Sequence, residues 1–156
     1  MRSTALLLLA SMACVAQQPT AKVTIFREDQ TILINSWNYK TGDFAPAGSR
    51  WNFYMDGMRL AMLTKNRFAT FIIPAGHHQF KFDGTEIVEI DVAPDAHLFM
   101  RPRPSVQGHR MVGTTVLDSL TCEDAEHRGR KTKPVDPRAL YSGTVVRENG
   151  FPVCLQ

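Results

Sequence analysis

The chain has few of the features that mark a metal site, a membrane domain or a nucleic-acid-binding surface. It contains three cysteines and five histidines in 156 residues, and no two histidines stand at the spacing of a helical metal site. Basic and acidic residues nearly balance at a formal net charge of +3, so we expect no overall attraction to nucleic acid. Beyond residue 16, no apolar run is long enough to form a membrane helix.

Catalytic and phosphate-binding motifs are also missing. The sequence has no Gly-x-Ser-x-Gly turn, no His-Glu-x-x-His helix and no glycine-rich phosphate loop. The best metal constellation is His77 across from Asp91, with His97 nearby in sequence, and a surface hydrogen bond is the preferred interpretation of that pair. We therefore predict no catalytic residue, no metal and no cofactor, and thus a protein that is not an enzyme.

The first sixteen residues, MRSTALLLLASMACVA, have the pattern of a secretory signal peptide. Arg2 precedes an apolar run, and the small residues Cys14 and Ala16 stand third and first before the predicted cleavage site. The sequence therefore predicts an exported protein, periplasmic or extracellular. The alternative is lipid anchoring through Cys14, although the residues before it match a lipoprotein signal poorly.

Two cysteines, Cys122 and Cys154, remain after this cleavage. An even number in an exported chain favours a disulfide, here one that closes the C-terminal segment. The alternative is a pair of buried free thiols. The chain then divides into a signal peptide at residues 1–16, a β-sandwich domain at residues 21–118 and a disulfide-tethered C-terminal segment at residues 119–156.

From residue 22 onward, apolar residues alternate with polar ones, which is typical of strands with one buried face. Turn sequences such as Asp56-Gly57 and Asp83-Gly84 separate the alternating runs. This spacing predicts an all-β fold, a small antiparallel β-sandwich with a meander core and an irregular C-terminal tail. The predicted strands cover residues 22–28, 31–35, 50–55, 58–64, 67–73, 78–83, 86–92, 97–101 and 111–117.

Turn lengths predict which residues pair in successive hairpins of one sheet. Turns at Lys65-Asn66 and at residues 74–77 continue the meander, with Phe71 opposite Leu60 on one side and Phe80 on the other. A two-residue turn at Asp56-Gly57 brings apolar residues opposite one another on the core face: Met55 and Met58, Phe53 and Leu60, Trp51 and Met62.

The adjacent histidines His77 and His78 follow a Pro-Ala-Gly turn at the start of a predicted strand. A three-residue loop at residues 83–85 places His78 opposite Ile90, at the rim of the core. Successive strand side chains point to opposite faces, so His77 points outward beside Asp91. The two histidines therefore cannot share a metal ion.

Residues 119–156 are charged, contain prolines and lack an apolar period, which predicts a surface segment with little regular structure. We expect a short helical turn near residues 122–126 and an edge strand at residues 144–146. The basic stretch at residues 127–133 follows acidic residues, so a solvated loop is preferred over a site for an anionic polymer.

Aromatic and apolar residues outside the predicted core are the candidates for binding. Tyr54, Phe68 and Ile72 form either a contact surface for a protein partner or a face that the Pro-rich tail covers. Trp37 and Tyr39 lie in a predicted loop, where aromatic rings often stack on sugars. Together with Tyr54, they are the candidate ligand-stacking residues.

The stretch NFYMDGMRLAMLTKNRFATFIIPAGHHQFKF combines an Asp-Gly hairpin with a Pro-x-Gly-His strand entry. In this it resembles a bacterial family of exported proteins called domain of unknown function 2846 and, more loosely, the PEGA-type surface domains. The resemblance covers residues 21–105 and implies a small β-sandwich of the cell envelope, often lipid-anchored, with no catalytic residues to carry over. The shared motif residues mostly make turns: Asp56, Gly57, Pro74, Gly76 and His77.

These observations predict an exported bacterial envelope protein that serves as a structural or protein-interaction module. Its partner is expected to be another envelope protein or a cell-wall component, bound by surface complementarity or by strand addition at a sheet edge. The alternative is a module that binds carbohydrate or another small ligand through exposed aromatic residues. We expect no nucleic-acid partner.

Overall fold

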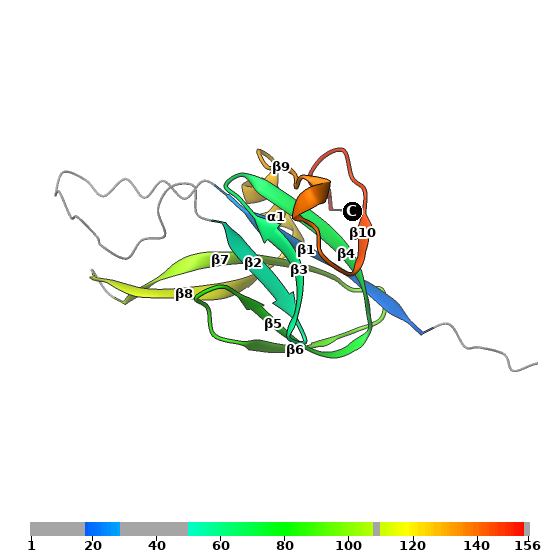
Figure 1. The fold of residues 1–156 in the computed structure, drawn as a ribbon, viewed down its shortest axis with the longest axis horizontal. Coiled ribbons are helices and arrows are strands. Elements are labelled where there is room, and N and C mark those ends of the chain that lie inside the picture. The colour runs from blue at the N-terminus through cyan, green and yellow to red at the C-terminus, as the bar shows by residue number, and fades with distance from the viewer. Residues whose placement is uncertain (1–17, 29–49, 108–109, 155–156) are drawn as a thin grey trace, which may run out of the picture.

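The computed structural model describes residues 18–28, 50–107 and 110–154 of the chain. The elements are β1 (Thr20–Arg27), β2 (Trp51–Met55), β3 (Met58–Leu63), β4 (Arg67–Pro74), β5 (Gly76–Phe82), β6 (Val88–Val92), β7 (His97–Gln107), β8 (Arg110–Leu120), α1 (Cys122–Gly129), β9 (Lys133–Pro134), the 3-10 helix η1 (Pro137–Ala139) and β10 (Thr144–Val146). Within the described residues, two β-sheets pack face to face as a sandwich, and one helix lies behind the sheet that contains β1, β4 and β7 (Figure 1).

The strands divide into two sheets that we call sheet A and sheet B. Sheet A has the order β10-β4-β1-β7-β8, with β9 beside β4, and sheet B has the order β3-β2-β5-β6. The predicted all-β sandwich is confirmed. Two pairings depart from the expected antiparallel arrangement, because β1 runs parallel to β7 and β4 runs parallel to β9.

The core between the sheets is built by the alternation that the sequence shows. Val23 and Ile25 of β1 and Phe71 of β4 face Phe53 of β2 and Phe80 of β5, and all five side chains are 0 % exposed. Burial of side chains of this size contributes about 1.5–3 kcal/mol each to the free energy of unfolding. These apolar contacts hold the two sheets together.

The predicted hairpin between β3 and β4 is wrong, because the turn at Lys65-Asn66 carries the chain from sheet B to sheet A. β4 pairs with β1, so Phe71 lies opposite Val23 and not opposite Leu60. The physical reason is that both arrangements turn the same side of β4 inward. Alternation therefore fixes the buried face of a strand and not its partner.

The predicted hairpin between β4 and β5 is wrong for the same reason. The chain returns to sheet B at Gly76, whose φ of 135° is open to glycine and strained for other residues. β5 then pairs with β2, and Phe80 lies opposite Met55 instead of Phe71.

The hairpin between β2 and β3 forms as predicted at its turn and differs farther along. Asp56 and Gly57 both have positive φ, 51° and 76°, as a two-residue hairpin turn of type I′ requires. Met55 pairs with Met58, but a β-bulge in β3 then shifts the register by one residue. Met58 is 49 % exposed at the turn and does not lie in the core. The shifted pairs are Phe53 with Ala61 and Trp51 with Leu63, instead of Phe53 with Leu60 and Trp51 with Met62.

The hairpin between β5 and β6 confirms the predicted register. His78 lies opposite Ile90, and His77 lies opposite Asp91. His78 is 8 % exposed and its neighbour points outward, so the two rings lie on opposite faces of sheet B.

The C-terminal segment closes one side of the sandwich. The predicted disulfide between Cys122 and Cys154 is present, and the predicted edge strand forms as β10 beside β4. The expected helical turn is a helix of eight residues whose N-terminus is capped by Thr121. Between β9 and β10, Leu140 bridges to Ala61 of β3, so the segment spans both sheets.

A second apolar cluster, which we call the outer core, lies on the face of sheet A that points away from sheet B. Phe26, Phe68 and Phe99 come from β1, β4 and β7, and α1 covers them with Ala125. Phe151 of the C-terminal segment packs edge-on against two of these rings, at centroid distances of 5.1 Å and 5.4 Å. Among the described residues, no helix has the length and apolar character needed to cross a membrane.

Candidate functional site

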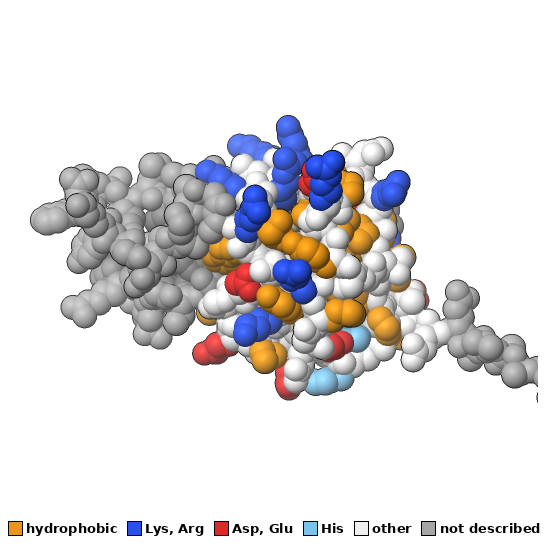
Figure 2. Space-filling model, in the orientation of Figure 1, with side chains coloured by type: hydrophobic (Ala, Val, Ile, Leu, Met, Phe, Trp, Pro, Cys, Tyr) orange, Lys and Arg blue, Asp and Glu red, His pale blue; other side chains and the backbone are white. Residues whose placement is uncertain are grey.

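The outer face of sheet B is the part of the sandwich that stays open to solvent in the described structure. Its side chains come from alternate positions of β2, β5 and β6, because neighbouring strand residues point to opposite faces. Tyr54, Gln79 and Lys81 project from this face, and Ile87 beside them is 55 % exposed. Figure 2 shows this side of the molecule, where apolar, basic and acidic side chains lie intermixed.

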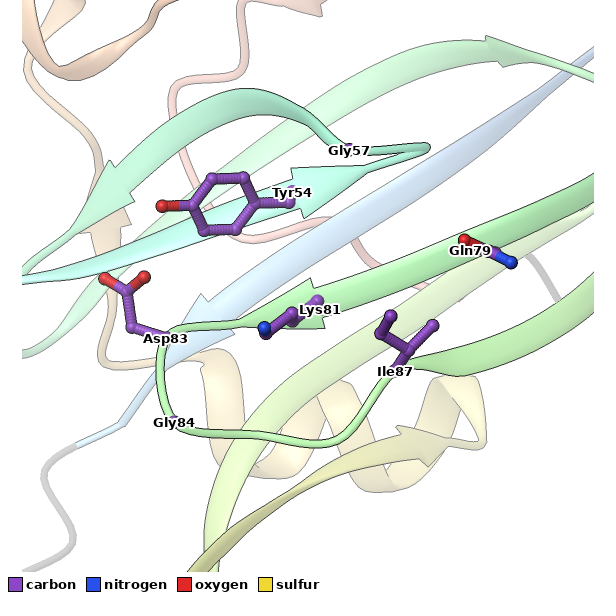
Figure 3. Close-up of a pocket in the computed structure, with 7 residues that line it drawn as sticks. All are labelled: Tyr54, Gly57, Gln79, Lys81, Asp83, Gly84 and Ile87. Atoms are coloured by element: carbon purple, nitrogen blue, oxygen red, sulfur yellow. The ribbon is translucent and has the colours of Figure 1, made fainter.

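A shallow hollow of about 350 Å³ lies on this open face. Figure 3 shows the aromatic ring of Tyr54 nearly face-on, with its hydroxyl at the end of the hollow where Asp83 lies, and Lys81 and Ile87 farther along the hollow. The lining residues are Tyr54, Gly57, Gln79, Lys81, Asp83, Gly84 and Ile87.

Asp83 lies beside the hydroxyl of Tyr54. Its Oδ2 accepts hydrogen bonds from the backbone nitrogen and the side-chain Nδ2 of Asn52, both at 2.8 Å. Burial and the neighbouring Asp83 carboxylate raise the pKa of the Tyr54 hydroxyl, which therefore stays protonated and donates to that carboxylate. Asp83 thus interacts with the hydroxyl end of a ring that lines the hollow.

The chemistry of the hollow suits a ligand with both apolar and hydroxyl-bearing surface. An aromatic ring packs against the C–H face of a sugar, and its polar neighbours hydrogen-bond the hydroxyl groups. Lys81 supplies donors at the rim, and Ile87 supplies apolar contact. The side-chain amide of Gln79 donates to Glu89 at 2.8 Å, so its carbonyl oxygen is left as an acceptor.

His77 forms the predicted contact with Asp91 beside this hollow. Its Nδ1 lies 2.9 Å from an Asp91 oxygen, and its Nε2 lies 3.8 Å from Glu89. The hydrogen bond to Asp91 raises the pKa of His77. His97 is not part of this cluster, because it lies in sheet A and contacts Thr24. Among the described residues, no three His, Cys, Asp or Glu side chains are arranged so that they could hold a metal ion.

His78 connects the Asp56-Gly57 turn to the core. Its Nδ1 lies 2.7 Å from Asp56, and its Nε2 lies 2.9 Å from the carbonyl oxygen of Pro74. Burial acts to raise the pKa of Asp56, but the Gln79 N–H and His78 outweigh it and lower that pKa. The motif residues therefore organise turns, as their sequence pattern predicts.

A chain of buried polar groups crosses the outer face of sheet A. The hydroxyl of Thr70 donates to Glu148 at 3.0 Å, and the Thr24 hydroxyl lies 2.8 Å from Thr70 and 2.7 Å from Nε2 of His97. Burial and then the Lys22 charge lower the pKa of His97 to about 4. Sequence reasoning missed this row of hydrogen bonds. Its only sign in the sequence is a threonine, Thr24 or Thr70, within the apolar run of each of two predicted strands.

The residues predicted as a contact surface do not form one surface. Phe68 is 2 % exposed in the outer core, so the alternative of coverage by the tail holds for it. Ile72 is 38 % exposed on β4 of sheet A, whereas Tyr54 lies on sheet B. Trp37 and Tyr39 lie outside the described residues, as does Cys14.

Sequence reasoning also missed five residues of the hollow: Gln79, Lys81, Asp83, Gly84 and Ile87. The sequence pattern places these residues in predicted strands and in the Asp83-Gly84 turn and gives them no shared role. Their convergence depends on the pairing of β2 with β5, which the meander prediction did not contain. The exposed Ile87 was the one available signal.

Comparison with known proteins identifies no relative: no protein-family model, no curated protein and no solved structure matches this chain. The resemblance to exported envelope families therefore stays a prediction that rests on the motif residues.

Proposed function

We propose that this protein is an exported, non-enzymatic module of the bacterial envelope that binds a cell-wall glycan at the hollow on sheet B. One observation carries the proposal: the Tyr54 ring lines the hollow, and the Asp83 carboxylate lies beside its hydroxyl. A pre-oriented ring loses little conformational entropy when a sugar stacks on it. The hollow of about 350 Å³ is at the lower end of the range for small-ligand sites, roughly 300–1,000 Å³.

The disulfide supports export. Cys122 and Cys154 are bonded, and such bonds persist in oxidising compartments such as the periplasm and the cell exterior. The apolar N-terminal stretch points to the same destination. In these compartments the ligands at hand are cell-wall polymers and other envelope proteins.

Titration of soluble glycan fragments into isotope-labelled protein tests the proposal. The probes are chitotetraose and enzymatically released peptidoglycan fragments, and amide shifts are expected around Tyr54 and Lys81. Tyr54→Ala should weaken binding at least tenfold. Tyr141→Ala is the matched control, because this tyrosine is 43 % exposed, stacks on Arg59 and does not line the hollow. Equal losses in both variants, or no shifts with any fragment, would overturn the proposal.

A protein partner bound by strand addition is the second candidate. Among the described residues β6 pairs only with β5, so its other edge presents unpaired backbone groups. Glu89 and Asp91 on this strand would limit unspecific pairing. Hydrogen exchange in the presence of an envelope fraction separates the two candidates. Protection confined to β6 favours the protein partner, and protection around Tyr54 favours the glycan.

A further inference from the structure

The structure gathers basic side chains from two distant chain segments at one end of the sandwich. We call this surface the basic end, and Figure 2 shows Lys and Arg side chains gathered along the part of the molecule where β9 and η1 lie. Its members are half-buried or exposed: Lys65, Arg67, Arg130, Lys131, Lys133 and Arg138.

The short strand β9 joins the two segments. Arg67 of β4 lies opposite Lys133 of β9, and the Lys133 backbone nitrogen donates to Asn66 at 3.0 Å. The Arg67 side chain then donates to the carbonyl oxygen of Pro134 at 3.3 Å. These contacts align basic residues more than sixty positions apart into a single extended track.

The acidic residues that precede this stretch in the sequence lie elsewhere. Glu123 and Asp124 occupy the first turn of α1, where negative charge stabilises the helix. Glu126 accepts a hydrogen bond from the backbone nitrogen of Cys154. The helix therefore separates the acidic turn from the basic residues that follow it, and the charge balance expected from the sequence does not hold in space. Asp136, which caps η1, is the one acidic residue within residues 127–138.

We propose that the basic end binds a linear acidic polysaccharide of the cell envelope. Arg130, Lys131, Lys133 and Arg138 form no ion pair with another described residue, so their charges are available. Arginine binds carboxylate or phosphate groups in a bidentate manner, and lysine adds positive charge along the track. An extended polymer with regularly spaced anionic groups matches this arrangement.

The surroundings of the track distinguish a polysaccharide from two other anionic partners. A membrane surface needs apolar side chains that insert beside the charges. The large exposed apolar residues of the described chain lie outside the track: Met58, Ile72, Ile87, Tyr141 and Val153. Single-stranded nucleic acid needs aromatic rings on which its bases stack, and residues 65–67 and 127–138 contain no Phe, Tyr or Trp.

Binding of polygalacturonate, a linear polycarboxylate, tests this inference by calorimetry across a series of salt concentrations. The Lys131→Gln, Lys133→Gln double variant should lose at least tenfold in affinity at 50 mM NaCl. Its logarithmic salt slope should shrink by about two, because roughly one counterion is released per basic contact. The control with equal charge loss is Lys22→Gln, Arg147→Gln, which should change affinity less than threefold.

Three results would overturn the inference. Equal losses in the two double variants would show a response to net charge alone, and no binding at 50 mM NaCl would exclude the site. Tighter binding to single-stranded DNA or to phosphatidylglycerol vesicles than to polygalacturonate would assign a different partner. The inference is independent of the Tyr54 hollow, because Tyr54→Ala should leave polygalacturonate binding unchanged. Urea denaturation of each variant checks that the fold is retained.

Discussion

The outer faces of the two sheets differ although both belong to strands with the same inward alternation. On sheet A, Phe26 is 0 % and Phe68 is 2 % exposed, because α1 and Phe151 cover them. On sheet B, the apolar Ile87 is 55 % exposed beside a hollow. The comparison shows that strands with apolar residues on both sides need a second cover, and the C-terminal segment supplies it. The outer face of sheet B has no such cover among the described residues, and its hollow stays open to solvent.

The covered face should respond most strongly to loss of an aromatic side chain. Phe26→Ala removes a fully buried ring from the outer core, and such changes cost about 3–5 kcal/mol of unfolding free energy. Ile87→Ala on the open face should cost less than about 1 kcal/mol. Urea denaturation of both variants measures the difference. Similar losses would mean that the outer core contributes no more than the open face.

The disulfide should contribute the next largest effect, because it holds the cover in place. Cys122 and Cys154 are 32 positions apart, and cross-linking a loop of this length stabilises by about 3–4 kcal/mol on the chain-entropy estimate. The Cys122→Ala, Cys154→Ala variant should unfold at correspondingly lower urea concentration. Glycan binding at the hollow should persist in buffer, since that site lies on the other sheet. Its loss in a variant that is still folded would show that the two faces are coupled.

A smaller effect is expected where the tail contacts the helix. A Cβ atom at Gly129 would lie 2.3 Å from the Phe151 ring, so Gly129→Ala must displace that ring from the outer core. Overpacking of this kind costs about 1–3 kcal/mol. Gly150→Ala is the control, because a Cβ atom at Gly150 would meet no other atom within 4 Å. Thermal unfolding of the two variants checks this, and equal melting temperatures would contradict the packing of Phe151.

The pKa values of the histidines on the two faces are shifted in opposite directions. His97 on sheet A has a pKa lowered to about 4, so the unfolded chain binds more protons between pH 4 and its ordinary value near 6.5. Stability from this group is complete above about pH 6.5 and declines toward pH 4, by about 1–2 kcal/mol after allowance for solvent screening.

His77 on sheet B has a raised pKa, so its contribution is present below about pH 6.5 and is lost as pH rises through the folded pKa. Titration of the imidazole signals by NMR measures both values. Asp91→Asn should bring the pKa of His77 toward its ordinary value and leave that of His97 unchanged. A normal pKa for His97 would contradict its burial beside Thr24.

The amino-acid sequence alone predicts where most described strands lie and which of their residues face the core, except in β3, where the bulge changes the buried positions. It also predicted the disulfide, the short helix, the edge strand at residues 144–146 and the register of the hairpin between β5 and β6. These features are local or chemically distinctive. A short loop fixes a hairpin register, and the predicted removal of Cys14 with the signal peptide leaves one possible partner each for Cys122 and Cys154.

The choice of pairing partners within each sheet depends on the tertiary structure. The connections at Lys65-Asn66 and Gly76 cross between sheets, yet they have the turn chemistry of hairpins and leave the same residues inward. The sequence pattern does not indicate the bulge in β3, because residues 60–63 are all apolar and show no alternation that a shift would break. The hollow and the basic end both depend on such non-local pairings, of β2 with β5 and of β4 with β9. The alternation of apolar and polar residues indicates which side of a strand is buried. The choice of the neighbouring strand depends on packing energies summed over the whole fold.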